Sequence, residues 1–167
     1  METELRAEIR PGTYTIDPSK STCRLVATHT FGLLPVEATV SITGGTVTLT
    51  ADPARYTASA TLAAASFRSG NKRRDSDITK RFFDAAHYPQ IAFRSTGFNG
   101  RRMTGVLSMR GTDSPVTLEI TNWASTGNGY RASATTTIDR IAAGVKAGRG
   151  MASRNVQLTL EVVVNAA

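Results

Sequence analysis

Cysteine and histidine are scarce in this sequence of 167 residues, which contains one cysteine and two histidines. The single cysteine, Cys23, excludes an intrachain disulfide, a clustered thiolate zinc site and a CxxC redox motif. Two separated histidines, His29 and His87, do not make the ligand pattern of a metal site. We therefore expect neither a metal nor a bound cofactor.

Long apolar runs are also missing. The sequence begins METELRAEIRPG, whereas a secretory signal or a membrane span needs a continuous apolar segment. We therefore expect a cytoplasmic protein with no stable membrane insertion. Residues 1–11 are predicted to be an N-terminal arm, either mobile or a short helix that packs Leu5 and Ile9. Residues 12–167 are predicted to form one domain.

Acidic residues are fewer than basic ones, 13 against 20, which gives a net charge of +7. A basic chain invites a nucleic-acid partner. Here the basic residues are scattered along the chain, and no recognisable nucleic-acid-binding motif accompanies them. We interpret the excess charge as a solvated basic surface and expect no nucleic-acid partner.

Helical periodicity is rare, and most of the sequence alternates between apolar and polar residues, which is typical of strands with one buried face. Gly44 and Gly45 are predicted to form a hairpin turn. Because the other connections are also short and turn-like, we expect an all-β, antiparallel meander, either a barrel or a sandwich. The alternation places these side chains inward: Cys23, Leu25, Ala27, His29, Val36, Ala38, Val40 and Ile42.

Two segments break this alternation, residues 69–84 and the segment that begins at Ile138. Both are predicted to be short helices or excursions between strands. In the first, Ser69 or Asn71 is placed to cap a helix. Such a helix would turn Phe82 and Phe83 toward one end of a barrel, either as an apolar lid or as ordinary core packing.

The predicted inward positions include many alanines, and small side chains around a wide barrel leave space inside it. Native interiors do not tolerate large empty voids. Either an apolar ligand occupies the space, or helix side chains and a narrower strand geometry close it. The alanines concerned are Ala27, Ala38, Ala58, Ala60, Ala132 and Ala134.

Four segments, in order along the chain, carry a resemblance: YTIDPSKSTCRLVATHTFG, SGNKRRDSDITKRFFDAAHYPQIAF, GVLSMRGTDSPVTLEI and TTTIDRIAAGV. Together they resemble the YceI-like family over roughly residues 12–164. The resemblance implies a lipocalin-like antiparallel β-barrel of about eight strands, capped by one or two short helices, that binds polyisoprenoids and related lipids. It also implies a homodimer. The sequence departs from the family pattern at Tyr14, Asp77, Ile78, Ala142 and Ala143.

The favoured hypothesis is a non-catalytic binding protein that encloses a polyisoprenoid, a prenylated quinone or a fatty-acid derivative. Transport, storage and sequestration all fit. His29 is the expected polar contact, with a satisfied core histidine as the alternative. Arg74, Asp75, Asp139 and Arg140 are expected to form structural ion pairs, although a basic cluster near the lid would also suit an acidic head group. The predicted ligand-binding residues are Leu25, His29, Phe31, Phe82, Phe83, Phe93 and Met109.

Two alternatives remain from the sequence. One is an enzyme that acts on a small biosynthetic intermediate in the same cavity, for which His29 is the only histidine suitably placed. The other is a filled barrel that binds an acidic partner through its basic surface. Cys23 lies within an apolar segment and is expected to be an inert buried thiol.

Overall fold

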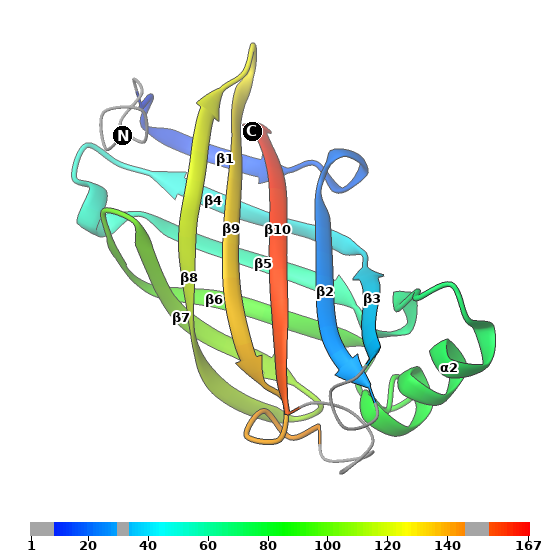
Figure 1. Ribbon diagram of the computed structural model, residues 1–167. Coiled ribbons are helices and arrows are strands. Elements are labelled where there is room, and N and C mark those ends of the chain that lie inside the picture. Colours follow the sequence, from blue (N-terminus) through cyan, green and yellow to red (C-terminus); the bar gives the residue numbers. More distant parts are fainter. Residues whose placement is uncertain (1–8, 30–33, 146–153) are drawn as a thin grey trace.

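The alternating segments form one antiparallel sheet that closes into a barrel (Figure 1). This computed structural model describes residues 9–29, 34–145 and 154–167. The sheet of the described residues has ten strands. They are β1 (Gly12–Ile16), β2 (Thr22–His29), β3 (Leu34–Val40), β4 (Ile42–Leu49), β5 (Thr57–Ala63), β6 (Gln90–Asn99), β7 (Arg102–Met109), β8 (Thr112–Ser125), β9 (Gly129–Asp139) and β10 (Asn155–Ala166).

The barrel has eight strand positions because two of them are each filled by two consecutive strands. Both β1 and β2 pair with β10, β1 near Val164 and β2 near Leu160. On their other sides, β1 pairs with β4 and β2 pairs with β3. The 3-10 turn η1 (Pro18–Lys20) separates β1 from β2. The Asp17 carboxylate caps this turn by accepting a hydrogen bond from the Ser19 amide. The predicted eight-stranded antiparallel barrel is therefore confirmed.

Gly44 and Gly45 do not form the predicted hairpin turn. Instead β4 continues through both glycines, with a bulge between Ile42 and Gly44. A Cβ atom on Gly45 would lie 2.2 Å from the Ser59 carbonyl oxygen and 2.7 Å from the Ile16 side chain. The glycine is needed because β1, β4 and β5 approach one another closely here.

The first predicted excursion lies between β5 and β6. It contains the 3-10 turn η3 (Ala64–Ser66), helix α2 (Lys72–Asp77) and the π-helical turn η4 (Ile78–Phe82). Asn71 caps α2 by accepting a hydrogen bond from the Arg74 amide at 3.0 Å. Figure 1 shows α2 at the opposite end of the barrel from the β8–β9 hairpin. Within the described ranges, no helix is long and apolar enough to cross a membrane.

The chain entering this excursion covers the edge of β3. Thr39 and Arg68 exchange two backbone hydrogen bonds of 2.9 and 3.0 Å, and the Ser66 hydroxyl accepts from the Ser41 amide. An uncovered edge strand would expose unpaired backbone groups. The excursion is thus anchored to the wall before it crosses the end of the barrel.

The second predicted excursion is a turn in its described part. Ile138 and Asp139 still belong to β9, and residues 140–144 form the turn that follows. Residues 146–153 lie outside the described residues, as do Leu5 and Phe31. Ile9 is described, and its side chain packs against the core.

Candidate functional site

The barrel encloses an apolar cavity of about 380 Å³. This volume falls within the range of roughly 300–1,000 Å³ that is common for small-molecule sites. Five of the six alanines predicted to point inward line this space without filling it, which argues against the filled-barrel alternative; the sixth, Ala38, is buried but is not part of the lining. The alternation predicted these wall residues correctly: Cys23, Leu25, Ala27, Val36, Val40, Ile42, Ala58, Ala60, Ala132 and Ala134.

Large and small side chains face each other across neighbouring strands. Ala60 pairs with Phe93, and Ala134 pairs with Leu160. Gly105 gives the Phe93 ring its room, since a Cβ atom there would lie 2.4 Å from that ring. Each pair places a small side chain beside a large one, which leaves space in front of the alanines open.

One end of the cavity, which we call the helical end, is covered by α2, η4 and the turn after β9. Phe82 and Phe83 line the cavity there, and Phe83 meets Phe67 edge to face at 6.0 Å. The Arg110 guanidinium donates to the backbone carbonyls of Arg81 and Phe82, at 2.8 and 3.2 Å. A few contacts from neighbouring turns therefore hold η4 over the barrel.

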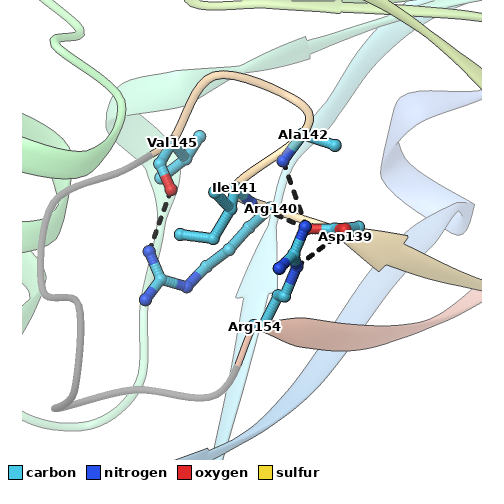
Figure 2. Close-up of polar contacts among 6 residues, drawn as sticks. All are labelled: Asp139, Arg140, Ile141, Ala142, Val145 and Arg154. Carbon is cyan, nitrogen blue, oxygen red and sulfur yellow. Dashed lines mark hydrogen bonds and ion pairs between the residues drawn. The ribbon is translucent and has the colours of Figure 1, made fainter.

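Two residues, Asp139 and Arg140, hold the turn after β9 through different contacts (Figure 2). The Asp139 carboxylate accepts from the backbone amides of Ile141 and Ala142, at 3.1 Å each, and pairs with Arg154 at 2.8 Å. The amide of Ala142, together with Arg154, lowers the pKa of Asp139. This bonding fixes the turn from which Arg140 projects.

Arg140 is a buried cation beside the cavity, 5% exposed. Its guanidinium donates to the Val145 carbonyl at 2.9 Å, as Figure 2 shows. Its central carbon also lies 5.2 Å from the centre of the Phe82 ring. Arg140 therefore links the turn after β9 to the π-helical turn.

The four residues expected to form ion pairs have varied partners. Asp139 pairs with Arg154, which the sequence analysis did not single out. Arg74 and Asp75 meet through Ser69, whose hydroxyl accepts from Arg74 and donates to the buried Asp75 carboxylate. Three cationic or anionic side chains of the excursion also line the cavity, Arg74, Asp77 and Arg81. The charges next to the cavity therefore gather at the helical end.

The other end, which we call the aromatic end, contains Arg10, Tyr14, Trp123 and Tyr130. Tyr130 is fully buried, with Tyr14 at 5.3 Å edge to face and Trp123 stacked at 4.9 Å between ring centres. The Arg10 guanidinium covers the Tyr130 ring at 5.2 Å, and its backbone amide donates to the Tyr130 hydroxyl. Burial raises the pKa of the Tyr14 phenol.

The sequence analysis missed Trp123, which lines the cavity. Strict alternation from Val116 through Ile120 would turn Asn122 inward and Trp123 outward. A bulge between Ile120 and Asn122 reverses this pattern and pairs Trp123 with Ala132. An aromatic residue out of phase in a strand is a weak signal for such a bulge.

Five of the seven predicted ligand-binding residues line the cavity: Leu25, Phe82, Phe83, Phe93 and Met109. His29 ends β2, but its side chain, like Phe31, lies outside the described part of the structure. Burial raises the pKa of the Cys23 thiol to about 11, so it stays protonated near neutral pH. Among the described residues, no cluster of three His, Cys, Asp or Glu side chains suits a metal.

A family model for the YceI-like domain matches residues 14–164. The chain belongs to the YceI-like family. The resemblance seen in the four sequence motifs is thereby confirmed. A comparison with curated proteins finds no match.

Solved structures share the YceI-like barrel. BcnA from Burkholderia cenocepacia is 26% identical with a TM-score of 0.74, over 90% of this chain and 99% of BcnA. A polyisoprenoid-binding domain from Saccharophagus degradans, implicated in plant cell wall breakdown, is 11% identical with a TM-score of 0.69, over 95% of this chain and 100% of that domain. The YceI protein of Campylobacter jejuni is 22% identical with a TM-score of 0.55, over 72% and 81%. The last two likenesses concern the fold alone.

Proposed function

We propose that this YceI-like chain is a non-catalytic binding protein that encloses an elongated apolar ligand. The observation that carries the proposal is the apolar cavity of about 380 Å³ inside the barrel. Each methylene group buried there contributes roughly 0.8 kcal/mol. A ligand chain would also restore the close packing that the inward alanines leave incomplete.

The ligand class is a polyisoprenoid, a prenylated quinone or a fatty-acid derivative. Leu25, Phe93 and Met109 supply apolar wall along the cavity, and Phe82 and Phe83 cover its helical end. The Saccharophagus degradans domain, which has the same fold, is named for polyisoprenoid binding and so supports the first of these classes. The biological role would be transport, storage or sequestration of the ligand.

The first test is native mass spectrometry of the protein purified from its own host, with organic extraction of whatever it releases. We expect a stoichiometric prenyl or acyl compound. A matched pair of variants on β5 sharpens the test. Ala58→Phe adds a ring to the cavity, whereas Thr57→Phe adds the same ring on the exposed face.

Ala58→Phe should lower the fraction of loaded protein about tenfold, because the new ring occupies ligand volume. Thr57→Phe should load like the wild type. Equal loading of both variants would place the ligand outside the barrel and contradict the proposal. The expected homodimer stays a prediction, which light scattering of the purified protein tests.

A further inference from the structure

The chain has a single tryptophan, and its indole N–H is a buried donor with no partner among the residues that the structure describes. Trp123 Nε1 has less than 1 Å² of accessible area and makes no hydrogen bond within the described residues. Buried polar atoms are nearly always hydrogen-bonded, so each exception needs a reason. The same indole lines the cavity, which makes the ligand a candidate partner.

Neighbouring side chains hold the indole at the aromatic end. Its plane lies 23° from that of Tyr130, whose other contacts include the Arg10 guanidinium and amide. Trp123 is paired across the strands with Ala132, and both line the cavity. The ring therefore has one face against Tyr130 and the small side chain of Ala132 beside it.

The cavity wall around Trp123 has few hydrogen-bond acceptors for the indole N–H. The other lining residues near Trp123 along β8 and β9 are Ile120, Ala132 and Ala134, which have apolar side chains. An indole nitrogen donates and cannot accept, so its partner must be an acceptor. In the described part of the structure, this apolar cavity has one unpaired donor at its inner end. It therefore matches a ligand whose hydrocarbon chain bears one oxygen atom on the end that enters the barrel first.

We propose that Trp123 Nε1 donates a hydrogen bond to a carbonyl oxygen on the inner end of the ligand. The acceptor class is a ketone, an ester or a quinone carbonyl carried on an apolar chain. This inference rests on the proposed function and adds the ligand's orientation to it. The oxygen-bearing group lies at the aromatic end and the hydrocarbon points to the helical end.

Contact requires a small movement of the indole, because Nε1 is covered before ligand enters. Stacking on Tyr130 allows the ring to slide within its own plane while the two faces stay in contact. The neighbouring Ala132 also lines the cavity, and its side chain is small. Ligand entry therefore changes the environment of one identifiable N–H group.

Two probes test the inference, a long-chain methyl ketone and the n-alkane of the same chain length. Because the chain has one tryptophan, its ¹H–¹⁵N spectrum has one indole signal. We expect the ketone to move the indole proton downfield as the hydrogen bond forms, and the alkane to leave it without such a shift. The wild-type protein is used, so no variant has to fold.

Affinities measured by displacement of an apolar dye give the second readout. Trp123→Phe should weaken ketone binding about tenfold, or about 1.4 kcal/mol, and alkane binding less than threefold. Phe93→Leu is the matched control, since it trims an apolar ring of the same cavity and should weaken both probes alike.

Two results would overturn the inference, and they differ in what else they overturn. If both probes bind, Trp123→Phe affects them equally and the indole proton shows no ketone-specific shift, the orientation is wrong while the binding function stands. If neither probe binds the wild type, the proposed function falls and the inference falls with it.

Discussion

The two ends of the barrel are closed by different means. At the aromatic end, Tyr14, Trp123 and Tyr130 come from strands of the wall, so the closure is part of the barrel itself. At the helical end, the covering residues Phe82 and Phe83 belong to an inserted segment between β5 and β6. Opening the first end requires breaking sheet, whereas opening the second requires releasing a few turn contacts. We therefore expect a ligand to enter at the helical end.

The largest expected difference between the ends is in stability. Tyr130→Ala removes a fully buried ring and should lower the free energy of unfolding by about 3–5 kcal/mol. Phe82→Ala removes a half-buried ring and should cost about 1–2 kcal/mol. Chemical denaturation measures both values. Equal losses would mean that the helical end is as integral to the fold as the aromatic end.

The next difference is kinetic. Phe83→Ala should speed ligand release about tenfold, because the ring that lines the cavity at its helical end is lost. Stopped-flow displacement of a bound apolar dye measures the rate. Phe98→Ala is the control, since the Phe98 ring packs against that of Tyr56, with 5.3 Å between ring centres, near the β6–β7 hairpin. Faster release from the control alone would move the entry route to the other end.

The smallest effect is a pH dependence of the turn after β9. The pKa of Asp139 is lowered in the folded protein, so its contribution is complete above its ordinary value of 3.8. That contribution is lost as the pH falls through the lowered folded value. Asp139→Asn should therefore be less stable than wild type at neutral pH, and the gap should narrow below about pH 4.

Urea denaturation at several pH values measures that gap. Glu37→Gln is the control, because Glu37 pairs with Arg24 on the outer wall with 67% of its side chain exposed. Such exposed pairs contribute little. A gap for Asp139→Asn that stays constant between pH 7 and pH 3 would refute the role of its charge.

The alternation of β2, β3 and β5 was enough to predict most of the part of the cavity wall that these three strands contribute, because each inward side chain follows directly from the strand period. The glycine pair was misread, since Gly44 and Gly45 give the same local signal for a turn as for a bulge. The structure distinguishes the two, because β4 pairs with β5 on both sides of the glycines and Ser59 leaves no room for a side chain at Gly45.

The aromatic end could not be predicted for a related reason. Tyr14, Trp123 and Tyr130 meet only after β1, β8 and β9 have taken their places in the barrel. The bulge in β8 also hides the inward direction of Trp123 from a period-two pattern. Local patterns predict strands and their faces, whereas contacts between distant strands depend on register.

The pairing of β1 with β10 also has a consequence for the time at which the barrel forms. Tyr14 lies opposite Ala166, so this seam of the wall joins the first strand of the sheet to the last. Contacts between such distant residues form slowly because the loop between them must first be ordered. While the ribosome is still adding β10, the earlier strands expose apolar faces and open edges. The barrel can therefore close around its cavity only after β10 has been made.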